Sequence, residues 1–342
     1  MLVKVVLVAS FGFITLSSAY GLERIRWKVQ VIANVSYWKP LWEDFVENVK
    51  IMSEGKIRFR IYEPNKIVPN PHVWEAIADD QLDAALTSPI YLSSKIPAVH
   101  FFSGVPFGPG YIEHTSWMRY GGGQELKNRI YGKMGLYSFD CVMTPPESGG
   151  WFKTKIKDFN QIKGEKIRFL GLGGRVMERI GMETVMLSFR DVVPAIEKGK
   201  ISAVEIGPPH NDILVGFHKL IKHNYYPGWF QQTFPIEFIV NKSKWSKISQ
   251  TAQAIIKTSC EKSYLSSLIK LTSMEPEAME SLKKDGVVFE EWEEKHLKNF
   301  QKIWNEIAEE ESSKDPLFAE VYQSHKNFRE KYAIWGDRAY LK

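Results

Sequence analysis

The sequence predicts an α/β fold made of two similar units, and two observations support this. Along residues 24–88, stretches of alternating apolar residues take turns with stretches of helical periodicity, in the order strand, helix, strand, helix, strand. This order is typical of parallel strands joined by helical crossovers. Residues 190–207 then repeat the helix, turn and strand cadence of residues 73–88. Two α/β lobes with the chain crossing between them form a cleft, where ligands usually bind.

The elements of the first unit follow from apolar spacing and from the residues that end each stretch. Gly55 stops the first helical stretch, and Pro64 ends the second alternating stretch. A turn at residues 79–83 separates a short helix from a buried strand. In chain order we expect strand 24–33, helix 36–55, strand 56–64, a helix from His72 and strand 84–88.

A glycine-interrupted helix leads from the first unit into the second. Residues 112–135 have helical periodicity around a run of three glycines, and residues 136–145 indicate a strand. The second unit is then expected to contain strand 163–169, helix 174–182, strand 183–188, and the helix and strand within 190–207. The last third is expected to contain helix 249–286, strand 287–292, and helices 294–310 and 315–335. These long C-terminal helices suit either a brace along both lobes or a dimer surface.

The N-terminus has the pattern of a secretory signal. Lys4 precedes an apolar run of about a dozen residues, which ends in the small residues Ser17, Ser18 and Ala19. The run is too short for a membrane span, which needs roughly 20 residues. We therefore expect residues 1–19 to be removed and the remainder to act outside the cytoplasm. The alternative is an uncleaved N-terminal anchor.

Composition narrows the classes of function. The 342-residue chain is 44% apolar and 25% charged, which are ordinary values for a globular protein of one or two domains. Its formal charge of +5 is spread over 45 basic and 40 acidic residues. Since no basic run with interleaved aromatic residues occurs, nucleic acid is not an expected partner. Cys141 and Cys260 could pair in an exported protein or could be buried free thiols.

The common catalytic signatures are absent from the sequence. It contains no HExxH, GxSxG or CxxC motif and no GxxxxGK followed by Ser or Thr. Residues 171–176, GLGGRV, resemble a phosphate loop only loosely. A binding function therefore has more support than catalysis.

Several long segments resemble the extracytoplasmic solute-binding proteins of tripartite ATP-independent periplasmic (TRAP) transporters, the DctP-type family. These segments are SEGKIRFRIYEPNKIVPN, QLDAALTSPIYLSSKIPAVHFFSGVPFGPG, GGWFKTKIKDFNQIKGEKIRFLGLGGRVMERIGM and AIEKGKISAVE. Within the family, YGGGQEL and YYPGW resemble the branch that binds 2-oxo acids and lactate through a metal ion. The resemblance implies a two-lobed periplasmic-binding-protein-like fold with an interlobe cleft. It also implies a periplasmic protein that delivers a small monocarboxylate to the membrane permease subunits.

By this resemblance, Arg168 matches the arginine that clamps the ligand carboxylate across the family. A planar guanidinium offers two parallel donors to a carboxylate, which fixes orientation as well as charge. The alternative is an arginine on the outer surface of a strand, but both of its neighbours, Ile167 and Phe169, are apolar.

The resemblance also implies a set of metal ligands. Glu205 ends a strand that otherwise reads as buried, so its carboxylate must be paired, metal-bound or solvated. The family places a metal-coordinating carboxylate there and uses the next backbone carbonyl, which belongs to Ile206 where the branch usually has tryptophan. Glu147 matches a glutamine ligand, whereas Gln231 falls where the branch often has glutamate. Carboxylate and amide side chains both provide oxygen ligands for hard cations. We therefore expect that the acid and the amide of the metal site have exchanged positions in this chain.

Charge counting favours Ca²⁺ over the alternative, Na⁺. Glu147, Glu205 and a bound carboxylate carry three negative charges, of which Arg168 offsets one. Uncompensated buried charge is costly, and a divalent cation would neutralise the remainder. A protonated Glu147 would reverse this preference.

Aromatic residues could wall the carbon chain of the ligand. The candidates are Trp38, Tyr91, Trp151 and Tyr226, and ordinary packing is the alternative for all four. Trp38 and Tyr91 are preferred, because they match first-lobe loops that meet the cleft in the family. Asn211 and Asp212 are expected to cap a helix that begins near Ile213.

The expected lobes are discontinuous. Residues 20–146 and about 236–285 would form lobe I, and residues 147–235 and about 286–342 would form lobe II with the C-terminal helices. Either a monomer or a dimer with exchanged C-terminal helices fits the resemblance. Two other functions are open: a sensory module that presents its ligand to a partner, and a secreted enzyme that uses the metal as a Lewis acid.

Overall fold

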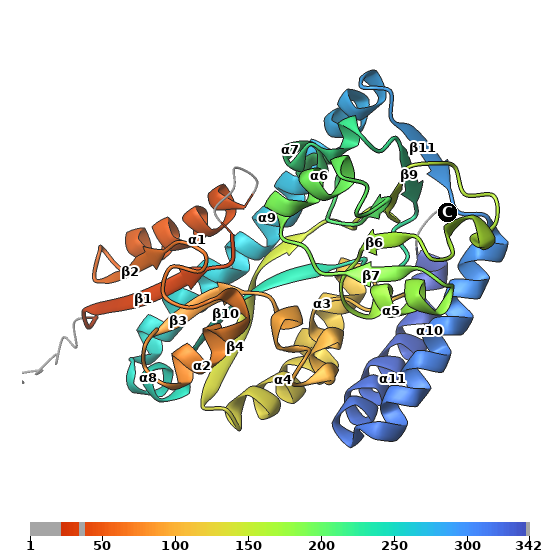
Figure 1. Cartoon of the computed structure of the whole chain (residues 1–342). Helices are drawn as coiled ribbons and strands as arrows, with labels where there is room; N and C mark the ends of the chain where they lie inside the picture. Colours follow the sequence, from red (N-terminus) through yellow and green to blue (C-terminus); the bar gives the residue numbers. More distant parts are fainter. Residues whose placement is uncertain (1–21, 34–37, 340–342) are drawn as a thin grey trace, which may run out of the picture.

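The computed structural model of the chain describes residues 22–33 and 38–339. Within these ranges, two mixed sheets with helices packed around them form two α/β lobes (Figure 1). The α/β class predicted from the sequence is therefore confirmed. The expected signal peptide at residues 1–19 lies outside the described residues. Among the helices that are described, none is long and apolar enough to cross a membrane.

The elements have the following bounds. The first sheet contains β1 (Ile25–Val31), β2 (Ile57–Tyr62), β3 (Ala84–Thr87), β4 (Leu136–Thr144) and β10 (Phe234–Asn241). The second sheet contains β5 (Trp151–Phe152), β6 (Lys166–Arg168), β7 (Glu183–Val185), β8 (Ala203–Val204), β9 (His223–Tyr226) and β11 (Val288–Glu291). The α-helices are α1 (Lys39–Met52), α2 (Val73–Ala78), α3 (Tyr111–Tyr120), α4 (Gly123–Gly132), α5 (Gly171–Arg179), α6 (Phe189–Glu197), α7 (Pro209–Val215), α8 (Lys242–Lys247), α9 (Gln250–Lys284), α10 (Glu294–Lys314) and α11 (Pro316–Ala339). The 3-10 helix η2 (Pro89–Leu92) contributes residues to the lining of the interlobe cavity, and η3 (Pro97–Phe102) packs against η2 and α11.

The first sheet has the strand order β2-β1-β3-β10-β4. As predicted, β1 runs parallel to both β2 and β3. Its apolar residues alternate inward, and they pack on the buried face of α1. The strand β10, which our sequence analysis missed, runs antiparallel to both β3 and β4 and makes the sheet mixed.

The second sheet has the order β11-β9-β5-β8-β6-β7. Parallel pairing of β6 with β7 and β8 follows the predicted repeat, in which α6 and β8 correspond to α2 and β3. The strand β5 runs antiparallel to its neighbours β8 and β9. The chain therefore crosses to the second lobe after β4 and returns after β9 to enter β10. Both crossing segments lie at the junction of the lobes.

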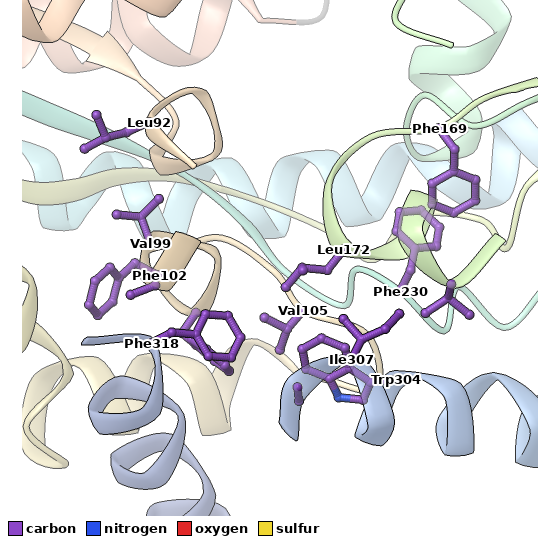
Figure 2. Packing of buried hydrophobic residues seen from close by; sticks show 14 of the residues in the cluster. Leu92, Val99, Phe102, Val105, Phe169, Leu172, Phe230, Trp304, Ile307 and Phe318 are labelled. Atoms are coloured by element: carbon purple, nitrogen blue, oxygen red, sulfur yellow. The ribbon is translucent and has the colours of Figure 1, made fainter. Parts of the chain in front are cut away.

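The C-terminal helices brace both lobes. The long helix α9 packs on α1 and β4 of the first lobe and on α7 of the second. The helices α10 and α11 pack on each other, with α10 against α5 and α11 against η3, α3 and α4 (Figure 1). Figure 2 shows how side chains of the first lobe (Val99, Phe102), the second lobe (Phe169, Phe230) and these helices (Phe318) share one hydrophobic core. These contacts are those of a brace, one of the two roles that the sequence left open.

Cys141 of β4 and Cys260 of α9 form a disulfide, which settles the alternative left open by the sequence. Since the bond joins residues 119 positions apart, it removes much chain entropy from the unfolded state. We predict that replacing both cysteines with serine lowers the free energy of unfolding by about 4 kcal/mol. Urea unfolding monitored by circular dichroism measures this loss. Wild-type protein unfolded in dithiothreitol should approach the double variant, and equal stability with and without reductant would contradict the prediction.

Two buried histidines predict a loss of stability in acid. Burial lowers the pKa of both His100 and His114 to about 4. An unfolded histidine titrates near 6.5, so between these values the unfolded chain binds more protons than the folded one. The stability that comes from each neutral histidine is complete above pH 6.5 and is lost as the pH falls toward 4, by about 3 kcal/mol each.

The variant His114→Gln isolates this effect, because glutamine is neutral throughout. Urea unfolding at pH 7 and pH 4.5 should show a smaller acid loss in His114→Gln than in the wild type. The exposed His72→Gln is the control and should change the acid loss less than His114→Gln does. Identical slopes in all three proteins would refute a buried, neutral His114.

Candidate functional site

A cavity of about 110 Å³ lies between the two lobes and is lined by residues from both. All seven residues that the sequence analysis proposed for ligand or metal line this one cavity: Trp38, Tyr91, Glu147, Arg168, Glu205, Ile206 and Gln231. Trp151 does not line it and is fully buried against Phe217, as expected for a packing residue.

A larger hollow of about 330 Å³ lies in the first lobe, between α3, α4, β4 and α9. Its aromatic faces are already occupied by cations of the chain: Arg119 lies over Tyr264, and Lys257 lies over Tyr137. Convergent buried polar groups gather in the smaller interlobe cavity instead, so we place the functional site there.

Arg168 is the last residue of β6 and is almost fully buried, with 4% exposure. Its Nη1 donates to the backbone carbonyl of Glu205 and lies 3.5 Å from Oε2 of the Glu205 carboxylate. The guanidinium also lies over the ring of Phe189. Among the hydrogen bonds between described residues, none uses Nη2. Nε donates to the Leu187 carbonyl over 3.5 Å, so Nη1 and Nε are both held by the protein, and the donors of Nη2 remain.

Glu205 follows β8 and lies at the mouth of the second sheet. Its backbone N–H donates to the carbonyl of Arg168 over 2.9 Å, which holds the two residues side by side. The side chain is 4% exposed, and Oε1 has no hydrogen-bond partner among the residues that the structure describes. A buried carboxylate oxygen without a partner is costly, so this atom points to a ligand.

Glu147 and Gln231 come together from the two segments that cross between the lobes. The Gln231 side-chain Nε2 donates to Glu147 Oε1 over 2.7 Å, and the backbone N–H of Glu147 donates to the Gln231 carbonyl over 3.3 Å. Gly228 permits this approach, since a Cβ there would lie 1.9 Å from the Glu147 carbonyl oxygen. Because the amide nitrogen is used by Glu147, the Gln231 side-chain oxygen is available to a cation.

The carboxylates of the site crowd one another. Burial, and then the negative charge of Glu205, raise the pKa of Glu147 well above its ordinary value. Burial also raises the pKa of Asp212 well above its ordinary value. Carboxylates that are crowded in a buried site favour protonation, and a bound cation can take the place of the proton.

The expected helix cap at Asn211 and Asp212 is wrong. Helix α7 begins four residues earlier than expected, at Pro209, so both residues lie in its first turns. Proline is favoured at the first helical position, and Pro208-Pro209 was the signal that could have found this start. Asn211 lines the cavity, whereas Asp212 is fully buried and accepts a 2.7 Å hydrogen bond from Trp151 Nε1.

The donor set suits a hard cation. Over the described parts of the chain, no group of three or more His, Cys, Asp or Glu side chains could hold a metal. The interlobe cavity is instead lined by the carboxylates of Glu147 and Glu205 and by the amide of Gln231, which are oxygen donors, and by Ile206, the residue whose carbonyl the resemblance implies as a ligand. Such donors are typical of Ca²⁺ sites, and the unpartnered Oε1 of Glu205 is consistent with a bound cation.

Comparison with known proteins places this fold and site in context. Residues 30–315 match the family model described as bacterial extracellular solute-binding protein, family 7. A curated relative from Nostoc, a monocarboxylate 2-oxoacid-binding periplasmic protein, is 30% identical over 327 residues, which cover 94% of this chain and 89% of the relative.

Solved structures of TRAP solute-binding proteins are similar along nearly the whole chain. One from Bordetella bronchiseptica, a dimer with calcium and picolinate in one site, is 25% identical with a TM-score of 0.88 and covers 93% of this chain and 95% of its own. One from Colwellia psychrerythraea with bound calcium and pyruvate is 27% identical, with a TM-score of 0.88 and coverage of 93% and 99%. One from Pseudoalteromonas atlantica with bound sodium and pyruvate is 25% identical, with a TM-score of 0.87 and coverage of 93% and 97%. The two-lobed binding-protein fold expected from the resemblance is confirmed.

Proposed function

Because this chain belongs to the bacterial extracellular solute-binding proteins of family 7, the DctP-type proteins of TRAP transporters, we propose that it captures a small 2-oxo or 2-hydroxy monocarboxylate in the periplasm. It would then deliver the acid to the TRAP permease subunits. The observation that carries the proposal is the convergence of Arg168 with Glu147, Glu205 and Gln231 on one interlobe cavity.

Arg168 grips the carboxylate of the ligand. Its buried guanidinium is held by Glu205 through Nη1 and by the Leu187 carbonyl through Nε, and Nη2 keeps its donors for the ligand. A carboxylate accepts two parallel hydrogen bonds from such a fork, which orients the acid in the cavity. Since Arg168 belongs to the second lobe and Trp38 and Tyr91 to the first, ligand binding favours the closed arrangement of the lobes.

Glu147, Glu205, Gln231 and the Ile206 carbonyl hold the cation, which is Ca²⁺ by charge counting, with Na⁺ as the alternative. A calcium ion held by these residues would supply positive charge to stabilise the oxygens of the bound acid. The presence of calcium with picolinate or pyruvate in two relatives supports this assignment, and sodium with pyruvate in a third supports the alternative.

The walls of the cavity select a compact ligand. Trp38, Tyr91 and Ile206 line it together with other apolar side chains. Its volume of about 110 Å³ is smaller than the roughly 150 Å³ of an engineered cavity that holds benzene. A cation with a three- or four-carbon acid matches this space better than a long or doubly charged acid does.

The site has a binding role without catalysis. The charged side chains of the cavity are all assigned to anion or cation, so none is left as a general acid or base. A sensory role in which the same closed form is presented to a partner protein is the second candidate. We further predict that residues 20–146 and about 236–285 form lobe I, and that residues 147–235 and about 286–342 form lobe II. The protein is either a monomer or a dimer with exchanged C-terminal helices.

Calorimetry on chelator-stripped protein tests the proposed function. Pyruvate and lactate should bind in the presence of Ca²⁺, and the affinity should fall sharply with chelator present. Succinate, a dicarboxylate, is the negative control. Equal pyruvate affinity with Ca²⁺ and with chelator would rule out a bridging cation, and turnover of the bound acid would identify an enzyme.

A further inference from the structure

We propose that Asp212 is a positioning residue that sets the spacing between the two loops that carry the cation ligands. This inference rests on the proposed function. One loop contains Glu147 and leads into β5, and the other contains Glu205 and Ile206 and leads from β8 into α7. Asp212 does not line the cavity, so it can act on the cation through its contacts or through its charge, which also acts on Glu147.

The contact that matters is the hydrogen bond from Trp151 Nε1 to Asp212 Oδ2, at 2.7 Å. Trp151 is four residues beyond Glu147, and Asp212 is six residues beyond Ile206. Both side chains are fully buried. The bond therefore connects the segment that contains Glu147 to helix α7, which follows the loop of Glu205 and Ile206.

The backbone alone holds these two loops weakly. β5 and β8 pair over only two residues each, with Trp151 opposite Val204, directly before Glu205. Because this pairing is so short, the buried side-chain hydrogen bond restrains the relative position of the two loops more than the sheet alone does.

Helix α7 transmits the position of Asp212 to the cavity. Its N-terminus is fixed to α9, because the His210 N–H donates to Glu275 Oε2 over 2.9 Å. Within α7, Asn211 packs so closely on Gly207 that a Cβ at Gly207 would lie 2.7 Å from its side-chain nitrogen. Helix α7 is thus fixed to α9 through His210 and to β5 through Asp212. These two contacts hold the loop of Glu205 and Ile206 at a fixed distance from Glu147.

Three variants separate positioning from charge. Asp212→Leu and Trp151→Phe each remove the hydrogen bond, and each should lower Ca²⁺ affinity about tenfold or more, as is typical for residues that support metal ligands. Asp212→Asn keeps an oxygen acceptor for Trp151 while removing the carboxylate, and it should bind Ca²⁺ within about twofold of the wild type. A role of Asp212 as a ligand or as a local charge predicts the opposite, with Asn as damaging as Leu.

Calorimetric titration with Ca²⁺ alone, at fixed pH and ionic strength, measures all three. The matched control is Tyr225→Phe, which removes a buried 2.7 Å hydrogen bond to the Ile156 N–H in the same sheet but away from the cavity. It should lower thermal stability without changing Ca²⁺ affinity. If Asp212→Leu does not fold, Trp151→Phe carries the test.

The outcomes distinguish this inference from the proposed function. Wild-type protein that binds neither Ca²⁺ nor, in a parallel titration, Na⁺ overturns both. Wild-type protein that binds Ca²⁺, with Asp212→Leu or Trp151→Phe binding it equally well, overturns only the positioning role. The same holds if Asp212→Asn loses as much affinity as Asp212→Leu.

Discussion

Replacing Arg168 with alanine should remove monocarboxylate binding while the protein stays folded. Losing one member of a buried, hydrogen-bonded charge pair typically costs about 2–5 kcal/mol of binding free energy. Here the loss should be at the upper end, because the acid would enter a cavity that already contains two carboxylates, Glu147 and Glu205. Arg168→Lys keeps the charge but not the fork, and it should recover only part of the affinity.

Calorimetry with pyruvate in saturating Ca²⁺ checks this prediction, and circular dichroism confirms the fold. Arg190→Ala, on the exposed side of α6, removes an arginine near Phe189 without touching the cavity and serves as the control. Wild-type affinity in Arg168→Ala would refute the clamp and would move the anion site away from β6.

Much of this site could be predicted because the signals are local. Arg168 is the last residue of β6 and Glu205 directly follows β8, and a buried charged residue at the end of a strand has few uses other than pairing or binding. Glu147 and Gln231 are 84 positions apart, yet they meet over 2.7 Å. Only the family resemblance related these two positions, since no local pattern connects them.

The features that were missed depend on tertiary structure. β10 reads FPIEFIVN, which is apolar enough for a strand, but its antiparallel place between β3 and β4 follows from the chain returning across the lobes. Asp212 resembles a helix cap by type, and only the position of Trp151 in β5 gives it a buried partner. Likewise, the disulfide required β4 and α9 to be adjacent, which spacing alone does not reveal.

Exchanging the acid at position 147 for an amide should change which cation the site prefers. With Glu147 and Glu205 ionised, a bound carboxylate present and Arg168 offsetting one charge, the wild-type site is neutralised by a divalent ion. Glu147→Gln removes one negative charge and also the group whose pKa is raised by burial and by Glu205. A monovalent ion then suffices, so Ca²⁺ affinity should fall by about tenfold or more, and pyruvate binding should become dependent on Na⁺.

The double variant Glu147→Gln/Gln231→Glu distinguishes charge from position. It moves the carboxylate to the partner across the same 2.7 Å contact and restores the wild-type charge. If total charge sets the preference, Ca²⁺ dependence returns in the double variant. Pyruvate titrations in Ca²⁺, in Na⁺ and in chelator, on all three proteins, measure this. Unchanged Ca²⁺ dependence in the single variant would show that Glu147 does not contribute to the cation site. If both variants lose the Ca²⁺ dependence of pyruvate binding, the geometry at residue 147 selects the ion and the summed charge does not.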